Sequence, residues 1–598
     1  MNVSEYIVNF LAEIGVKHVF EITGGAAAHM IDAFHDRTDI KYVCAQHEQA
    51  AAMMADAYSR LGGNIGVVMT TSGPGATNLI TGICCSYFDS IPVLYLTGQV
   101  GRKAYKGDRK VRQLGFQETD IISIVKPITK YAAMVTNPAT IKYLLKKAVA
   151  IAREGRKGPV LLDIPEDITW LDMPDDVELK DWQESFDLKT PTNSEINECL
   201  ALIQKASRPL IISGGGVRHA GATEELLRFA ELTNIPVAQS YAGIDTFPHN
   251  HPLYAGIVGA YGNRTANFAV ANCDLLLALG TRMCLRQVGS NPELFAREAK
   301  KIVVDIDPNE LNQIIKADIP LSCDVKQLLI SLNQAVERLR GSSTAYAATN
   351  HFWNQKIREW KERYPFCYLH TEPSGKKVNP YLFFKVLSEE MADDDVLVLD
   401  TGQNLAIAAQ TLNVRKGQRV FSSWANTPMG YALPAAAGAA FQRGKKHVLC
   451  AMGDGGIQLN IQELQTIVYY NLPVKIFVLN NDCYGMVRQF QDLYFEKRHE
   501  ASVKNKGYSH PDFRKVANAY GIKATIISNN ESLHAKIREV LDFRNAILCE
   551  VPLPEDMAAL PRLERGHPIE DQAPYLPRDE WRQNMIVKPY EGWEKVKE

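Results

Sequence analysis

The chain has 598 residues with 66 basic and 68 acidic side chains, which gives a formal net charge of −2. A charge this close to zero argues against nucleic acid as the main partner, and no apolar run is long enough to predict a membrane-spanning segment. At about 150 residues per domain, the length predicts three to four domains with large buried cores.

Cysteine usage and the N-terminus predict a cytoplasmic protein. The eleven cysteines show no Cys-x-x-Cys pair and no regular spacing, and Cys84 and Cys85 are adjacent. Residues 1–5 are polar rather than typical of a signal peptide. We therefore expect reduced, buried thiols in a cytoplasmic environment.

The first third of the chain predicts strands that end in glycine-rich turns. Residues 66–70 form an apolar run that predicts a strand, and the turn at residues 72–76 leads into a predicted helix. Glu48 lies at the start of another predicted helix. A single glutamate at such a position is, on frequency alone, more typical of a capping role.

Three more strands are predicted in the middle of the chain. Residues 209–213 enter the glycine turn at 214–216, residues 274–279 end at Gly280, and residues 302–306 end in acidic residues. Polar, proline-bearing stretches at residues 171–195 and 341–378 predict domain boundaries on either side. The second stretch contains a charged, helix-like run around residues 353–363.

The most specific motif lies in the last third. Apolar runs at residues 447–452 and 474–479 predict buried parallel strands, with a periodic helix pattern over residues 458–470 between them. The first strand leads to Asp454 in a Gly-Asp-Gly turn, and the second leads to Asn481. Loops at the carboxyl ends of neighbouring parallel strands bind ligands in open α/β sheets. A carboxylate and an amide oxygen, completed by carbonyl, water and phosphate oxygens, suit Mg²⁺.

This arrangement resembles the thiamine diphosphate motif, and nearly the whole chain resembles the acetolactate (acetohydroxyacid) synthase branch of that family. The resemblance implies an α/β fold of three domains with parallel sheets: two thiamine diphosphate-binding folds of one topology that flank a Rossmann-like middle domain. The expected units are an N-terminal pyrimidine-binding domain at residues 1–170, a central domain at 190–340, a C-terminal diphosphate-binding domain at 375–555 and a tail at 556–598.

The resemblance also implies the cofactor site. Glu48 of one subunit corresponds to the glutamate that hydrogen-bonds the aminopyrimidine ring and promotes proton loss from the reactive carbon of a cofactor held by the other subunit. Phe116, Gln117 and Met429 are the other expected catalytic residues. The expected metal ligands are Asp454, Asn481 and the backbone carbonyl of Cys483. The remaining expected cofactor contacts are Gly25, Gly73, Pro74, Asn78, Gly402, Gln403, Asn404, Gly453, Gly455, Gly456, Tyr484, Gly485 and Met486.

In the synthases the middle domain binds FAD, which implies an FAD site here at Arg156, Gly215, Arg282, Asp305 and Asp324. A different nucleotide, or no ligand, remains open for this domain. The expected substrate contacts are Ala26, Arg286 and Phe490. Four positions that bear on substrate choice depart from the synthase pattern: Phe490 replaces a tryptophan, Glu166 replaces a lysine, and Cys284 and Leu285 replace two acids. These departures favour a different or larger acceptor.

The implied function is a thiamine diphosphate- and Mg²⁺-dependent decarboxylating carboligase that acts on a 2-keto acid, with pyruvate as the donor. Alternatives are transfer of the two-carbon unit to another acceptor such as a keto sugar, a 2-keto acid decarboxylase, a flavin-linked pyruvate oxidase, and a catalytically silent member. A site shared between subunits implies a homodimer or homotetramer.

Residues 564–577 of the tail are rich in proline and charge, so we expect them not to contribute to a core. They could instead form a strap on a neighbouring subunit or a lid that orders when ligand binds.

Overall fold

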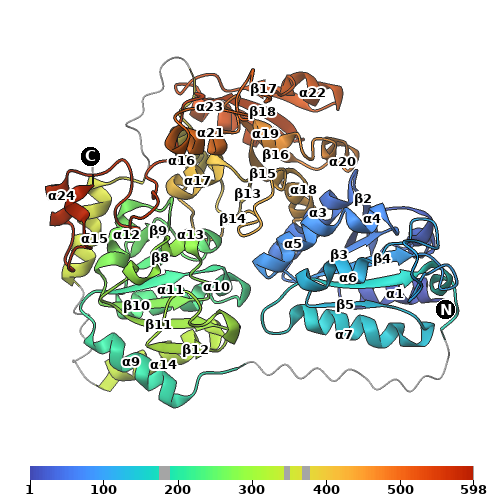
Figure 1. Ribbon diagram of the computed structural model, residues 1–598, viewed down its shortest axis with the longest axis horizontal. Helices are drawn as coiled ribbons and strands as arrows, with labels where there is room; N and C mark the ends of the chain where they lie inside the picture. Colours follow the sequence, from blue (N-terminus) through green and yellow to red (C-terminus); the bar gives the residue numbers. More distant parts are fainter. Residues whose placement is uncertain (174–188, 343–350, 367–376, 597–598) are drawn as a thin grey trace.

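The computed structural model describes residues 1–173, 189–342, 351–366 and 377–596. Most of the expected boundary stretches, at residues 174–188, 343–350 and 367–376, lie outside the described residues. The described chain forms three six-stranded parallel sheets, each covered by helices, followed by a tail (Figure 1). This confirms the α/β fold with three parallel sheets.

The first sheet has the strand order β2-β1-β3-β4-β6-β5. Its strands are β1 (His18–Ile22), β2 (Lys41–Cys44), β3 (Gly66–Thr70), β4 (Val93–Gln99), β5 (Tyr131–Met134) and β6 (Val160–Pro165). The helices around it are α1 (Val3–Glu13), α2 (Ala28–Asp32), α3 (Glu48–Gly62), α4 (Pro74–Thr77), α5 (Ile80–Asp89), α6 (Ile121–Val125), α7 (Ile141–Arg153) and α8 (Glu166–Thr169). Strands β3 and β4 are buried along their whole length, as expected for central strands covered on both faces.

The middle sheet has the order β12-β11-β10-β7-β8-β9, which is the doubly wound order 3-2-1-4-5-6 read from the other edge. Its strands are β7 (Pro209–Ser213), β8 (Val237–Gln239), β9 (Tyr254–Ile257), β10 (Leu275–Leu279), β11 (Lys300–Asp305) and β12 (Ile319–Ser322). The helices are α9 (Asn193–Lys205), α10 (Gly215–His219), α11 (Thr223–Thr233), α12 (Arg264–Asn272), α13 (Leu285–Val288), α14 (Val325–Ser342) and α15 (His351–Arg363). The Rossmann-like expectation is confirmed.

The third sheet has the order β14-β13-β15-β16-β18-β17, which repeats the order of the first sheet strand for strand. Its strands are β13 (Val396–Leu399), β14 (Arg419–Phe421), β15 (Val448–Gly453), β16 (Val474–Asn480), β17 (Lys523–Ile526) and β18 (Ile547–Pro552). The helices are α16 (Pro380–Glu390), α17 (Gln403–Thr411), α18 (Ala432–Gln442), α19 (Asp454–Ile457), α20 (Glu463–Tyr469), α21 (Gly485–Tyr494), α22 (Phe513–Ala519) and α23 (Leu533–Asp542). Strands β15 and β16 pair in parallel as predicted, but the predicted helix over residues 458–470 begins only at Glu463.

The N- and C-terminal units pack through α3 and α18, both rich in alanine. A Cβ atom added to Gly438 of α18 would lie 2.7 Å from the carbonyl carbon of Met54, so the two helix backbones touch. Beside this contact Arg60 is buried between Asp56 and Asp89, and the Tyr431 hydroxyl donates to Asp56 at 2.6 Å. A buried arginine needs such partners because an unpaired charge would be costly to desolvate. The contact fixes α3, and with it Glu48, against the C-terminal unit.

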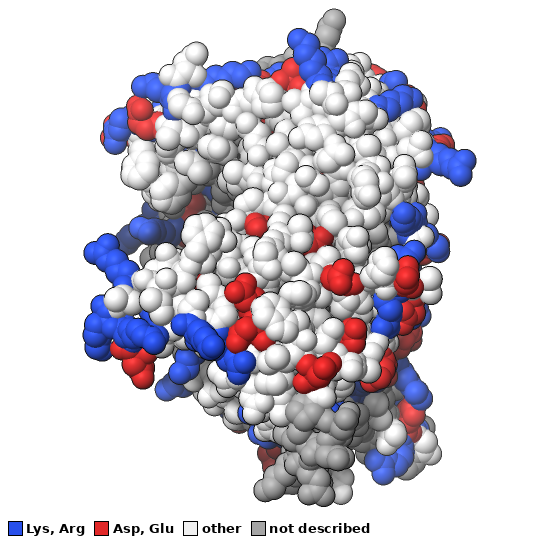
Figure 2. Space-filling view, turned by 90° about the vertical axis from the view of Figure 1, so that its right-hand side faces the viewer, with Lys and Arg blue, Asp and Glu red and all other residues white. Residues whose placement is uncertain are grey.

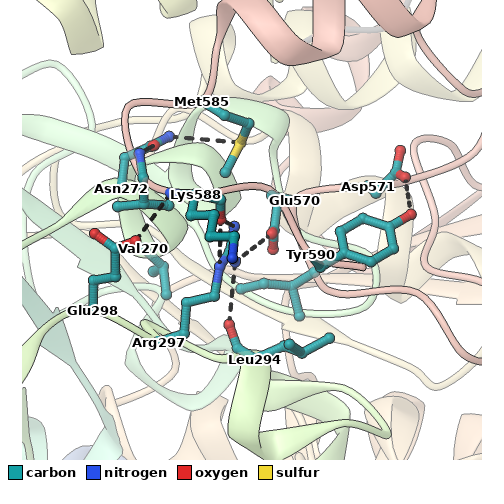
Figure 3. A network of polar contacts seen from close by, with 12 residues as sticks. Val270, Asn272, Leu294, Arg297, Glu298, Glu570, Asp571, Met585, Lys588 and Tyr590 are labelled. Atoms are coloured by element: carbon teal, nitrogen blue, oxygen red, sulfur yellow. Dashed lines mark hydrogen bonds and ion pairs between the residues drawn. The ribbon is translucent and has the colours of Figure 1, made fainter. Parts of the chain in front are cut away.

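The tail packs on the middle unit of the same chain, where α24 (Arg578–Gln583) lies beside α15 (Figure 1). Trp581 is fully buried, and Ile569, Met585 and Val587 join the same apolar cluster. Arg297 donates to Glu570 at 2.8 Å and to the carbonyl of Lys588 (Figure 3). Ile569 belongs to residues 564–577, so the expectation that this stretch does not contribute to a core is wrong.

Candidate active site

The strand orders place one topological switch point in each sheet, where neighbouring strands have connections that leave in opposite directions. These points lie between β1 and β3, between β7 and β10, and between β13 and β15. Ligands of open α/β sheets bind beyond the carboxyl ends of the strands at such points. Most of the expected site residues follow these strands or strands beside them, so the topology gathers them into three places.

The loops after β15 and β16 bring together the expected metal ligands. One end of the Asn481 amide lies 3.2 Å from Oδ1 of Asp454 and 2.9 Å from the carbonyl oxygen of Cys483. If the amide oxygen occupies this end, three oxygen atoms converge, and the amide nitrogen donates to Oε1 of Gln403 at 3.4 Å. Oxygen ligands of an octahedral Mg²⁺, each at about 2.1 Å, would lie about 3 Å apart. The three oxygens fit such a cation.

Asp454 is held by the surrounding loop. Its Oδ2 accepts a 2.6 Å hydrogen bond from the Tyr508 hydroxyl, which leaves Oδ1 for the oxygen cluster. Burial raises the pKa of Asp454 to about 6, and a bound divalent cation would oppose this by favouring the carboxylate. Tyr508 was not predicted, because it lies in an irregular loop whose spacing from Asp454 follows no periodicity.

The starts of α17 and α21 meet beside this cluster. A Cβ atom added to Gly485 would lie 2.5 Å from Nδ2 of Asn481 and 2.8 Å from Cδ of Gln403. Gly402, the N-cap of α17, has a φ of 128°, a conformation that favours glycine. Free backbone N–H groups at two adjoining helix starts suit a diphosphate, since they donate to anions.

Two expected diphosphate contacts have other partners in this structure. The Gln403 side-chain amide donates to Oε1 of Gln489 and to the carbonyl of Met557, both at 2.9 Å, and that of Asn404 donates to the carbonyl of Asp400 at 2.9 Å. Their backbone amides at the helix start are the better candidates for anion contact.

The Met429 side chain lies close to the Gly-Asp-Gly turn. Its methyl group would lie 3.3 Å from a Cβ atom at Gly455, where Tyr484 approaches to 2.5 Å. Any larger residue at position 455 would fill this space. Below it, Asp400 is fully buried and accepts from the backbone amides of Gly430 and Ala432, each at 3.1 Å. These bonds fix the loop that carries Met429.

The first switch point gathers the N-terminal site residues. Glu48 begins α3 and accepts a 2.9 Å hydrogen bond from the Asn78 amide. Gly73 has a φ of 59°, and a Cβ atom there would lie 2.8 Å from the carbonyl oxygen of Gln117. The structure therefore brings Glu48, Asn78, Gly73 and Gln117 together. Phe116, in contrast, is 85% exposed.

The remaining expected residues of this unit follow the same two strands. A Cβ atom added to Gly25 would meet no atom within 4 Å, whereas Ala26 packs its carbonyl against Gly98. Pro74 begins α4, where the missing N–H costs no hydrogen bond. Among the described residues no hydrogen bond joins Glu48 to the loops that carry the oxygen cluster. The two groups lie in different units.

The middle switch point opens into a cavity of about 750 Å³. All five expected FAD contacts line it: Arg156, Gly215, Arg282, Asp305 and Asp324. Ten lysine and arginine side chains line it against five acids, which suits an anionic ligand. A Cβ atom at Gly216 would lie 2.8 Å from Cα of Gly280, so only glycine lets these two loops meet.

Two of the expected substrate contacts, Arg286 and Phe490, line different cavities. Arg286 lines the 750 Å³ cavity, and its guanidinium lies 4.7 Å above the ring of Tyr241. Phe490 lines a second groove of about 510 Å³, together with Leu285 and the tail. The structure therefore does not place Arg286 and Phe490 in one pocket.

Comparison with known proteins agrees with this geometry. Family models match residues 1–124 (thiamine pyrophosphate enzyme, N-terminal TPP binding domain), 196–332 (central domain) and 400–551 (C-terminal TPP binding domain). The acetolactate synthase large subunit of Lactococcus lactis subsp. lactis is 34% identical over 94% of this chain and 94% of its own.

Two further relatives have similar coverage. The probable acetolactate synthase large subunit of Methanocaldococcus jannaschii is 37% identical over 95% of this chain and 94% of its own. The acetolactate synthase isozyme 3 large subunit of Escherichia coli K12 is 36% identical over 90% and 92%. The chain belongs to the thiamine pyrophosphate enzyme family, in its acetolactate synthase-like branch.

Proposed function

We propose that the protein is a thiamine diphosphate- and Mg²⁺-dependent decarboxylating carboligase of the acetolactate synthase type, with pyruvate as its donor. The observation that carries this proposal is the convergence of Asp454, Asn481 and the Cys483 carbonyl beside the paired starts of α17 and α21. It is supported by relatives named as acetolactate synthase large subunits that cover at least 90% of the chain.

Residues of the chain have distinct roles in this proposal. Asp454, Asn481 and the Cys483 carbonyl hold Mg²⁺, and the backbone amides at the starts of α17 and α21 hold the diphosphate. When bound, thiamine diphosphate supplies the carbanion that adds to a keto-acid carbonyl and the electron sink for loss of CO₂. Glu48 exchanges a proton with the aminopyrimidine ring, while Asn78 holds its carboxylate in place.

We propose that two copies assemble one active site. The Glu48 group and the oxygen cluster lie in different units, and Phe116 is almost fully exposed in the single chain. Figure 2 shows one face of the molecule whose upper part carries few charged side chains, and β2 and α20, which lie on this side in Figure 1, expose Tyr42 and Tyr469. Such a face suits self-association into a homodimer or homotetramer.

We propose FAD as the ligand of the 750 Å³ cavity. Its position at the switch point of a doubly wound sheet and its excess of basic side chains support a dinucleotide. Flavin absorbance of the purified protein tests this directly. Flavin bleaching and peroxide formation on addition of pyruvate would favour a pyruvate oxidase instead.

We propose domains at residues 1–170, 190–340 and 375–555, followed by a tail at 556–598. We also propose a cytoplasmic location. Among the described residues, the helices are all too short or too polar to cross a bilayer.

The test of function is product analysis with pyruvate, thiamine diphosphate and Mg²⁺. Acetolactate and CO₂ together support a synthase. CO₂ with acetaldehyde, diverted only when another carbonyl compound is added, supports the second candidate, a carboligase with a different acceptor. The 510 Å³ groove at Phe490 has room for an acceptor larger than pyruvate, which favours this second candidate.

A further inference from the structure

The 510 Å³ groove runs along α21, whose first residue adjoins the metal loop. The first residue of α21, Gly485, touches Asn481, and the next residues, Met486 and Val487, already line the groove. Phe490 and Tyr494 continue its floor on the same helix and are exposed in the single chain. The volume is typical of a site that buries a ligand much larger than pyruvate.

The opposite wall of the groove is a turn of the tail that carries two arginines, Arg562 and Arg565. The backbones of Arg562 and Ala573 exchange two hydrogen bonds of 2.9 and 2.8 Å, and Asn291 donates to the carbonyl of Gly566 at 3.0 Å. The turn is therefore fixed to the middle unit. The hydrogen-bonded backbone of this turn holds both arginines beside the groove.

Both arginines have donors left for a ligand. Arg562 donates through Nη2 to Glu564 at 3.1 Å, but its Nε is buried without a partner among the described residues. Arg565 is exposed and makes no ion pair or hydrogen bond with the described chain. A buried guanidinium N–H without a partner costs free energy, and a planar guanidinium binds phosphate or carboxylate through two parallel bonds.

We propose that this groove holds a carbonyl acceptor larger than a simple keto acid, with its carbonyl at the start of α21 and a remote anionic group, phosphate or carboxylate, at Arg562 and Arg565. The inference rests on the proposed carboligase function and specifies the acceptor of that same site. The apolar side chains of Val487 and Phe490 then cover the middle of the acceptor, and the tail arginines select its charged end.

Matched pairs of acceptors test the inference on the complete enzyme with Mg²⁺, thiamine diphosphate and pyruvate. Fructose 6-phosphate is compared with fructose, and 2-ketoglutarate with 2-ketovalerate, so that each pair differs in one remote anion. The pair with the larger ratio of kcat/KM identifies the anion as phosphate or carboxylate. We expect at least one charged member to be preferred about tenfold or more. Equal use within both pairs overturns the inference.

The variant Arg565→Gln should raise KM for the preferred charged acceptor about tenfold and leave the ratio to its uncharged partner near one. Arg565→Lys should recover part of the preference because the charge remains. The control is Arg544→Gln, an exposed arginine just before the amino end of β18 that does not line the groove, which should behave as wild type.

Two further outcomes separate the explanations. Calorimetry without pyruvate should show weaker binding of the preferred charged acceptor to Arg565→Gln than to wild type. This measurement does not depend on pyruvate being the donor. CO₂ release from pyruvate alone tests the proposed function separately. If Arg565→Gln changes the oligomeric state and leaves the acceptor ratio intact, the groove is a subunit contact and the inference is wrong.

Discussion

Gly485→Ala tests whether Gln403 and Asn481 must lie where the structure places them. The added methyl carbon would lie 2.5 Å from Nδ2 of Asn481 and 2.8 Å from Cδ of Gln403, whereas non-bonded carbon contacts are normally about 3.5 Å or longer. Both side chains must therefore move by about 1 Å. Because their ends are flexible, the fold should tolerate the change, but displacement of about 1 Å at such a site costs about 100-fold in rate, or about 2.7 kcal/mol.

The assay is the dependence of CO₂ release from pyruvate on Mg²⁺ and thiamine diphosphate concentration, with the melting temperature measured in parallel. Gly341→Ala is the control, since a Cβ atom there meets no described atom within 4 Å. We expect Gly485→Ala to lose about 100-fold in activity or cofactor affinity with little change in melting temperature. Wild-type activity and affinity in Gly485→Ala would refute the placement of Asn481 and Gln403 at the site.

Three other changes follow from the contacts described. Glu48→Gln should lower kcat about 100-fold or more while cofactor binding, followed by calorimetry, persists, because the amide cannot exchange the proton; unchanged turnover would revive a silent or differently catalysed member. Asn481→Ala should abolish the stabilisation by Mg²⁺ with thiamine diphosphate, which for wild type at 100 times Kd is about 2.7 kcal/mol and appears as a higher melting temperature; an equal shift in the variant would exclude Asn481 as a ligand. Burial raises the pKa of Asp163 to about 7, so this carboxyl stabilises the fold fully below about pH 4 and loses that contribution, a few kcal/mol, as the pH rises through about 7. Asp163→Asn should therefore flatten the fall in melting temperature between about pH 4 and pH 7, and an unchanged pH profile would contradict the assignment.

The local elements around the site were predictable because each has a strong short-range signal. Short apolar runs predicted β3, β15 and β16, and Glu48 begins α3 as expected. The helix predicted over residues 458–470 was too long, because residues 458–462 form turns between α19 and α20, which starts at Glu463. Periodicity does not reveal where a loop interrupts a helix.

Contacts between distant segments could not be predicted from the sequence. Composition suggested a tail that adds no core, but Trp581 packs on an apolar surface of the middle unit, and Glu570 is paired with Arg297. Pairing by residues hundreds of positions away cannot be read from proline and charge content. The same applies to Tyr508, which holds Asp454 from an irregular loop.

The placement of Arg286 shows a related limit. The resemblance suggests that Arg286 contacts the substrate, and this stays a prediction; its guanidinium lies over the ring of Tyr241 in the 750 Å³ cavity. A motif fixes a position along the chain, whereas the rotamer depends on neighbours, and the acids that usually follow in this motif are Cys284 and Leu285 here. The cations that line the groove at Phe490 are instead Arg562 and Arg565.

The most direct test of the central claim is CO₂ release from pyruvate by the purified protein, measured with both Mg²⁺ and thiamine diphosphate, with each alone, and with neither. If Asp454, Asn481 and the Cys483 carbonyl form the metal site, release requires both additions and is lost on chelation by EDTA. Release that is indifferent to Mg²⁺, or no release under any condition with fully bound cofactor, would contradict the account.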